Sequence, residues 1–239
     1  MFVFFLFRLF ESGLFPVHAV FQEEFNPACL AYRRFEVSSF GQERFGLAEF
    51  RTFELSLAVP SGAVALNTFG NENYRENQLA FGFGSAVNRR LAAGAEIDIL
   101  NCWIREQANR FSYRLKVGGL GQAGRFTIAS WLNNVNRPRF NETDRLPLSY
   151  GLDFRFAASE RFSPCFSILG AEGTRPFFKF GFNLTLAAPV RLTGGINSGP
   201  VQVEYGIRFR FRAYNFVYAG STHQQLGLTH GLGFQFAAP

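Results

Sequence analysis

Long apolar runs are missing from this chain. No stretch of about 18 or more consecutive apolar residues occurs, although 47 % of the 239 residues are hydrophobic. A membrane-spanning helix needs such a run, so none is predicted. The strands of a membrane barrel need only about 9–11 residues each and alternate in polarity, so this absence does not exclude a membrane barrel. The mean hydropathy of +0.01 indicates that apolar and polar residues are finely interleaved.

Side chains that bind metals or form cross-links are also scarce. The three cysteines, Cys29, Cys102 and Cys165, are odd in number and have no CxxC spacing, which supports neither a disulfide framework nor a zinc site. Of only three histidines, His223 and His230 fall in one expected hairpin. No HxxxH motif or histidine–carboxylate cluster accompanies them. We expect no metal and no cofactor.

Catalytic motifs are equally weak. Gly119–Gly124 matches G-x-G-x-x-G, but a dinucleotide fingerprint requires a helix to follow, and Arg125–Ala129 reads as a strand. A glycine-rich hairpin turn is the favoured interpretation. Ser221 and His223 could join a distant aspartate on paper, yet no G-x-S-x-G motif occurs. The chain is not predicted to be an enzyme.

The abundant feature is phenylalanine at alternate positions. The chain has 32 phenylalanines. In residues 78–100, QLAFGFGSAVNRRLAAGAEIDIL, Phe81, Phe83, Ile97 and Ile99 alternate with glycine, glutamate and aspartate. A period of two is typical of β-strands. About fourteen segments read as strands in this way: 30–40, 51–59, 62–70, 77–87, 91–103, 110–119, 124–133, 147–157, 161–171, 176–186, 190–197, 200–212, 214–222 and 227–237.

The connections between these segments alternate in length. Short turns such as Pro60-Ser61 alternate with longer connections at 41–50, 71–76, 104–109 and 134–146. Outer-membrane barrels have short periplasmic turns and longer external loops. The pattern predicts an all-β fold, a transmembrane antiparallel β-barrel of about 14 strands.

A soluble β-rich binding module with its apolar face inward is the alternative. Its polar face would meet water, yet here that face is crowded with glycine and alanine, which weaken a solvated strand. The many phenylalanines and leucines would also overfill a sandwich core of this size. The net charge of +6 comes from scattered arginines, so no nucleic-acid partner is predicted. The expected partner is outer-membrane lipid.

Charged residues fall on the less apolar face of the predicted strands. Inside a barrel such charges must pair. They could form an ion-paired filling that supports the wall and blocks leakage, or a polar pathway for a solute. Both interpretations stay open. The residues are Glu54, Glu96, Asp98, Arg114, Lys116, Asp153, Arg155, Lys179, Glu204, Arg208 and Arg210.

Four stretches carry a resemblance through their order and spacing. They are Phe25–Ala31, Phe69–Glu76 running into Leu79–Gly84, Leu91–Asn101, and Ser221–His230 followed by Phe234 and Phe236. Together they resemble a Bacteroidota family of FadL-like outer-membrane barrels, which includes PorV- and PorQ-like proteins associated with type IX secretion. The resemblance spans about residues 20–237.

The resemblance implies a fourteen-strand barrel with N-terminal residues folded into the lumen as a plug or hatch. Asn26, Pro27 and Ala28 are the plug candidates. Cys29 departs from the family, which usually has glycine there. Residues 1–20 have an apolar start without a basic segment, so they read as a degenerate signal or an N-terminal segment. Residues 21–239 are expected to form a single outer-membrane barrel.

The resulting expectation is a non-catalytic protein of the bacterial outer membrane. A structural or accessory role in an envelope complex is favoured. In that role the protein could have another envelope protein as a partner. One alternative is a FadL-like transporter of a hydrophobic or small solute. The soluble β-rich binding module is the other.

Overall fold

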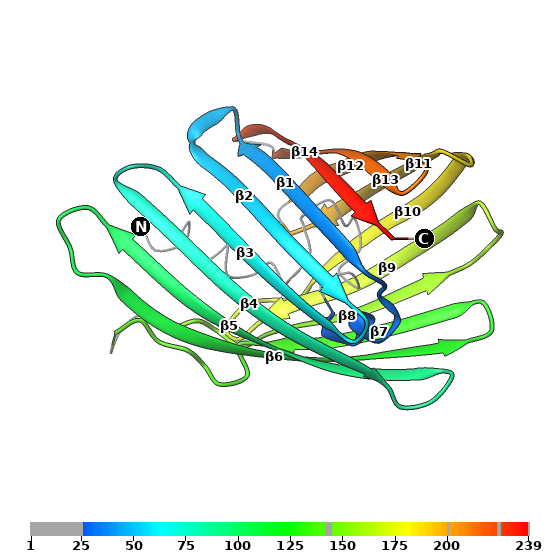
Figure 1. Ribbon diagram of the computed structural model, residues 1–239, viewed down its shortest axis with the longest axis horizontal. Helices are drawn as coiled ribbons and strands as arrows, with labels where there is room; N and C mark the ends of the chain where they lie inside the picture. The colour runs from blue at the N-terminus through cyan, green and yellow to red at the C-terminus, as the bar shows by residue number, and fades with distance from the viewer. Residues whose placement is uncertain (1–25, 142–144, 200, 224–225, 239) are drawn as a thin grey trace.

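Fourteen antiparallel strands form one closed sheet in the computed structural model, which describes residues 26–141, 145–199, 201–223 and 226–238 (Figure 1). Each strand pairs with its chain neighbours, and β1 also pairs with β14. This confirms the predicted fold class and strand number. The strands are β1 (Glu36–Arg44), β2 (Leu47–Val59), β3 (Gly62–Gly70), β4 (Tyr74–Ala86), β5 (Leu91–Ile104), β6 (Arg110–Ala123), β7 (Phe126–Asn133), β8 (Ser149–Phe156), β9 (Phe162–Ala171), β10 (Phe177–Ala187), β11 (Val190–Ser198), β12 (Val201–Phe211), β13 (Tyr214–His223) and β14 (Gly227–Ala237).

The apolar face of the sheet points outward. Phe81, Ile97 and Leu115 are register partners on β4, β5 and β6 and form an exposed row on the wall. The residues between them point to the other face, where the partners Asp98 and Arg114 on β5 and β6 are fully buried. Because side chains alternate between faces, the charged face is the interior. This is the reverse of a soluble barrel or sandwich.

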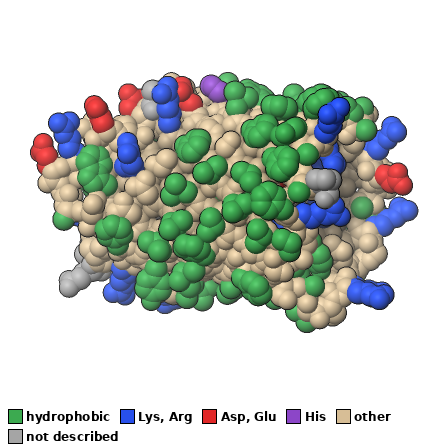
Figure 2. Space-filling view, viewed as in Figure 1, with side chains coloured by type: hydrophobic (Ala, Val, Ile, Leu, Met, Phe, Trp, Pro, Cys, Tyr) green, Lys and Arg blue, Asp and Glu red, His purple; other side chains and the backbone are tan. Residues whose placement is uncertain are grey.

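The outer wall carries an apolar band between two charged ends. Figure 2 shows hydrophobic side chains across the middle of the visible face, with lysine, arginine and acidic side chains gathered at both ends. A soluble monomer rarely exposes an apolar patch above a few hundred Å², whereas a membrane barrel needs such a band. The alternative of a soluble module with its apolar face inward is therefore wrong.

The N-terminal part differs from the expected strand at 30–40. Pro27–Tyr32 instead forms a 3-10 helix, η3, and β1 begins only at Glu36. Asn26 caps the helix by accepting a hydrogen bond from the backbone N–H of Ala28 at 2.9 Å. Pro27 at the first helical position already has the φ that a helix requires. The expected segment at residues 1–20 lies outside the described residues.

The two ends of the barrel have different connections. At the turn end, residues such as Pro60-Ser61 join neighbouring strands within two residues. At the opposite loop end, 134–148 is the longest connection. The expected loop at 41–50 is wrong, because Phe45 and Gly46, with φ of 59° and 67°, join β1 to β2 in a tight turn. Positive φ at both central residues matches the strand twist of a hairpin.

Helices add little to this architecture. Among the described residues, no helix has the length and apolar character that crossing a membrane would require. The G-x-G-x-x-G stretch lies mainly in β6, which continues to Ala123, and the turn follows at Gly124 with a φ of 60°. No helix starts there, as expected from the sequence.

Candidate functional site

Near the turn end, the interior of the barrel holds η3. Gly84, Gly94 and Gly118 are register partners across β4, β5 and β6 and share the interior face. A Cβ atom on any of the three would overlap the chain around Asn26 and η3. Here glycine is required because the backbone of η3 approaches Gly84 and Gly94 closely, and the Asn26 side chain approaches Gly118. The three glycines form a seat for the helix, which we call the glycine row.

Asn26 fastens η3 to the wall. Its side-chain Nδ2 donates to the carbonyl oxygens of Gly119 at 2.9 Å and Ser130 at 2.8 Å, on β6 and β7. Its Oδ1 is used by the helix cap. Asn26, Ala28 and Leu30 are all fully buried. The apolar side chains of η3 pack on mostly small wall residues, which are Ala58, Ala65 and Ala80 around Leu30, and Ala92, Ala129 and the larger Leu120 around Ala28.

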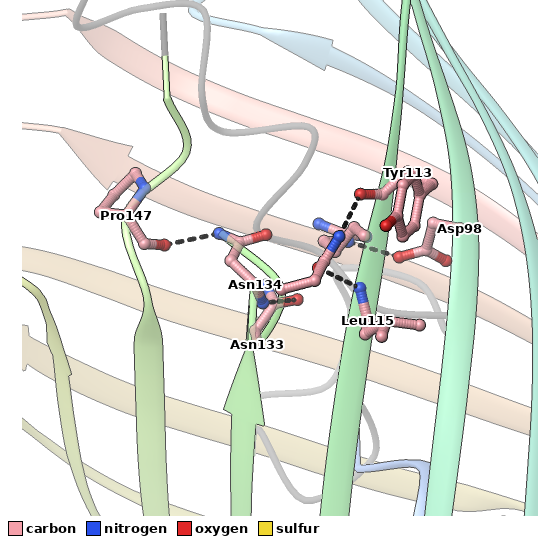
Figure 3. Close-up of polar contacts among 8 residues, drawn as sticks. Asp98, Tyr113, Leu115, Asn133, Asn134 and Pro147 are labelled. Atoms are coloured by element: carbon pink, nitrogen blue, oxygen red, sulfur yellow. Dashed lines mark hydrogen bonds and ion pairs between the residues drawn. The ribbon is translucent and has the colours of Figure 1, made fainter. Parts of the chain in front are cut away.

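A charged layer lies beyond the glycine row toward the loop end. Asp98 on β5 and Arg114 on β6 form an ion pair with both side chains fully buried (Figure 3). Glu96 is the register partner of Lys116 one step closer to the turn end. The Lys116 ammonium also lies 5.7 Å from the ring centroid of Trp131. Burial of charges is costly unless they are paired. We therefore expect the charged side chains of this layer to be held in fixed positions beside their partners.

A second ion pair joins β10 and β12 across the intervening β11, on the other side of the interior. Lys179 Nζ on β10 lies 2.6 Å from Glu204 Oε2 on β12. The remaining predicted charges vary in burial. Glu54 and Asp153 are buried, Arg155 and Arg208 are half-buried, and Arg210 is exposed.

Two of these arginines donate hydrogen bonds to nearby groups. Arg155 donates from Nη2 to Thr127 Oγ1 at 3.4 Å, and Arg210 donates from Nε to the carbonyl of Arg212 at 3.3 Å. The structure therefore brings the predicted charges to the interior face, where Asp98–Arg114 and Lys179–Glu204 form ion pairs. Whether they act as a filling or as a pathway stays a prediction.

Sequence reasoning missed Glu76, a buried interior carboxyl group. Tyr74 donates a hydrogen bond to it from the adjacent interior position of β4. The expected strand began at residue 77, so both residues were assigned to a loop. Tyr74 and Glu76 continue the period of two of the buried Gln78 and Ala80 on the same face, and this was the signal that could have extended the strand.

The loop 134–148 covers part of the loop end of the interior. Leu146 is buried and, together with Phe140, packs against Leu100, which lies on the interior face of β5. Asn134 Nδ2 donates to the carbonyl of Pro147 at 2.7 Å, which closes the base of the loop (Figure 3). The β5–β8 side of the described interior is thus filled from η3 to this loop.

A loop asparagine completes the edge of β6. β7 pairs with β6 only from Lys116 onward, so the preceding part of β6 has no β7 partner. Asn136 fills this role with two hydrogen bonds, donating to the carbonyl of Tyr113 at 2.7 Å and accepting from the N–H of Leu115 at 2.8 Å (Figure 3). Backbone groups that lose a strand partner need such a substitute.

Aromatic side chains gather inside the loop end of β1–β4. The rings of Phe50 and Phe69 are stacked with centroids 6.0 Å apart, and the Arg44 guanidinium lies 5.2 Å from the Phe69 centroid. Tyr74 adds a third ring on the same interior face. We call Phe50, Phe69 and Tyr74 the aromatic mouth. Among the described residues, no group of three or more metal-ligating side chains could hold a metal ion.

Comparisons with known proteins identify similar structures and so support the fold. No family model and no curated protein matches the chain. Among solved structures, the CymD monoaromatic hydrocarbon channel matches with a TM-score of 0.66 and 12 % identity, covering 94 % of both chains. The Pseudomonas putida toluene transporter TodX matches with a TM-score of 0.61 and 10 % identity, covering 94 % of this chain and 93 % of its own. The fold is that of FadL-like outer-membrane barrels.

A third match agrees with this conclusion. A Pseudomonas aeruginosa FadL homologue has a TM-score of 0.59 and 10 % identity, and the match covers 94 % of this chain and 95 % of that one. With the apolar outer band, the FadL-like fold confirms the expected location in the bacterial outer membrane. The narrower resemblance to PorV- and PorQ-like proteins of the Bacteroidota is not confirmed by these matches.

Proposed function

We propose that the protein is an outer-membrane channel for a small, largely apolar solute. The similar structures described as channels or transporters favour the transporter alternative over the accessory role expected from the sequence. An accessory role in an envelope complex stays a prediction, which co-purification in mild detergent would test. The proposal rests chiefly on the uneven filling of the interior.

The two sides of the interior differ in burial. On β5 and β6, interior side chains such as Leu100, Asp98 and Arg114 are fully buried. On β11 and β13, the interior-facing Thr193 and Ser221 are only half-buried. A solute that passes the aromatic mouth would follow this less tightly packed side. Rings at the mouth suit an apolar solute because they offer a face for stacking and for dispersion contacts.

The helix η3 is proposed to act as the hatch expected from the resemblance. Its support is the buried position of Asn26, Pro27 and Ala28 on the interior face near the turn end. The hydrogen bonds of Asn26 to two wall carbonyls would hold the hatch closed. Opening would expose the glycine row to the lumen.

Toluene uptake by cells with an intact outer membrane tests the channel. Plain phospholipid vesicles are unsuitable because toluene crosses them unaided. Expression of the full chain should raise uptake of radiolabelled toluene above that of cells without it. Phe50→Ala together with Phe69→Ala should lower the increase by roughly tenfold, since each lost ring contact is worth about 0.5–1.5 kcal/mol.

The matched control is Phe53→Ala together with Phe81→Ala, which removes two exposed outward rings. These variants should transport as the unaltered chain does. Heat-modifiable gel migration would show that every variant is folded. Uptake no higher than in cells without the protein, with a folded barrel in the membrane, would contradict the proposal.

A further inference from the structure

A groove of about 570 Å³ lies on the outer wall at the loop end, where β14, β1, β2, β3 and β4 adjoin. Most of its lining residues have outward parity. Those with inward parity, such as Gln42 and Thr52, alternate with them along the same strands. The groove is therefore separate from the interior and opens toward the lipid.

Two rows of residues build the groove. The register places His230, Glu43 and Arg51 side by side on β14, β1 and β2, and Gly70 and Arg75 side by side on β3 and β4. Because Thr52 pairs with Phe69, Gly70 lies beside Arg51 and joins the two halves. This polar row runs across five strands at the loop end.

The second row lies one outward position closer to the membrane centre. It consists of Leu232, Gly41, Phe53 and Thr68, which are consecutive register partners. Leu232 and Phe53 are 68 % and 50 % exposed and rise on either side of Gly41. The low floor and its apolar walls have the shape that an extended acyl chain would fill.

Gly41 has no packing reason to be glycine. A Cβ atom built there would meet no atom within 4 Å, and its backbone is not in the left-handed region. Glycine inside a strand weakens it and often marks a close approach of a ligand or another backbone. This differs from Gly231 on the neighbouring strand, where a Cβ would meet the ring of Phe40. The missing side chain at Gly41 keeps the groove open.

The polar row has an excess of positive charge. Arg51 and Arg75 oppose one carboxylate, Glu43, whose Oε2 lies 3.2 Å from Arg51 Nε. The Arg51 side chain is 66 % exposed, so the rest of its guanidinium faces outward. Two strand spacings, roughly 10 Å, separate the backbones of the two arginines, and Gly70 leaves the space between them without a side chain. Long arginines can converge over such a gap on one phosphate.

We propose that this groove binds a membrane lipid that carries a phosphate headgroup. The phosphate would lie between Arg51 and Arg75, and one acyl chain would run over Gly41 between Phe53 and Leu232. The polar row lies on the loop-end side of the row that contains Leu232 and Phe53, so its charges would meet headgroups where the apolar row meets acyl chains. The inference is independent of solute passage through the interior.

Lipid retention by the full chain tests this site. The protein, purified in mild detergent, would be titrated with phosphatidylglycerol and examined by native mass spectrometry. Arg51→Gln with Arg75→Gln should weaken retention of the tightest lipid by at least about tenfold. The matched control is Arg105→Gln with Arg175→Gln, which removes two exposed loop-end arginines outside the groove and should have no effect.

A second pair of variants tests the acyl-chain floor. Gly41→Leu fills the groove and should also weaken retention at least about tenfold. Gly119→Leu is its control, because it adds the same side chain on the outward face of β6, where a Cβ meets nothing closer than 3.7 Å. Equal retention by the Gly41 and Gly119 variants would overturn the proposal. So would displacement of the lipid by millimolar inorganic phosphate, which would assign the site to a free anion.

Discussion

Asp98 and Arg114 show how single residues determine the interior. They are direct register partners, both fully buried, and each provides the countercharge that the other needs. In such a setting the pair adds little net stability over an apolar pair of similar volume, but loss of one member leaves an unpaired buried charge. The cost of changing one residue should therefore exceed the cost of changing both.

Asp98→Asn should lower the free energy of unfolding by about 3–5 kcal/mol, because it leaves Arg114 buried without a full countercharge. The double variant Asp98→Leu with Arg114→Leu should recover most of this loss. Urea unfolding in lipid vesicles, followed by heat-modifiable migration, measures both effects. Glu160→Gln in an exposed turn serves as the control. An Asp98→Asn midpoint equal to that of the control would contradict the role of the pair.

At the scale of elements, η3 depends on the glycine row more than on its own length. A six-residue 3-10 helix has little stability alone. Its backbone approaches Gly84 and Gly94, and the Asn26 side chain approaches Gly118, so closely that no other residue type fits without displacement. The docking of the helix is thus encoded in the strands that receive it.

Gly94→Leu should displace η3 from the wall without opening the barrel. Cys29 lies in the helix and reports this directly, in a background with Cys102→Ala and Cys165→Ala. Its labelling by a water-soluble maleimide should become about tenfold faster or more, corresponding to at least about 1.4 kcal/mol of lost docking. Ala95→Leu, on the outward face of the same strand, should leave the rate unchanged. Equal labelling rates in the two variants would contradict the docking of η3 on the glycine row.

The elements that sequence could predict are those with strict alternation. Most strands from β3 onward match their expected ranges within a few residues, since the period of two runs through them. The first strand was placed at 30–40 because nothing local distinguishes the apolar residues of η3 from a strand. Their helix depends on Asn26 and on the distant glycine row. The tight turn at Phe45-Gly46 was not predictable from the sequence, because phenylalanine rarely adopts positive φ.

The candidate site was predictable as a face but not as a set of contacts. Alternation placed Glu96, Asp98, Arg114 and Lys116 on one side of their strands, and register then made them partners. The groove around Gly41 was invisible in the sequence, because it forms only where the last strand meets the first. Closure of the barrel brings residues nearly two hundred positions apart into one row.

At the scale of the whole molecule, the apolar wall sets the environment. The position of a charge along a strand should decide its cost. Ile97→Lys, near the middle of β5, should destabilise the barrel in vesicles by about 2–4 kcal/mol, whereas Leu91→Lys at the turn end should cost about 0–1 kcal/mol. Both side chains are exposed on the outer wall. Equal costs in urea unfolding would contradict a membrane-centred band.

Spin-label accessibility in reconstituted bilayers tests the arrangement of the two faces most directly. Single labels would replace Phe81, Ile97 and Ile207 on the outer wall, and Thr193 and Ser221 on the interior face. The outer labels should collide with oxygen and be shielded from a water-soluble nickel chelate, because they lie in lipid. The interior labels should show the opposite preference. Greater nickel accessibility at the outer positions than at the interior ones would contradict the account.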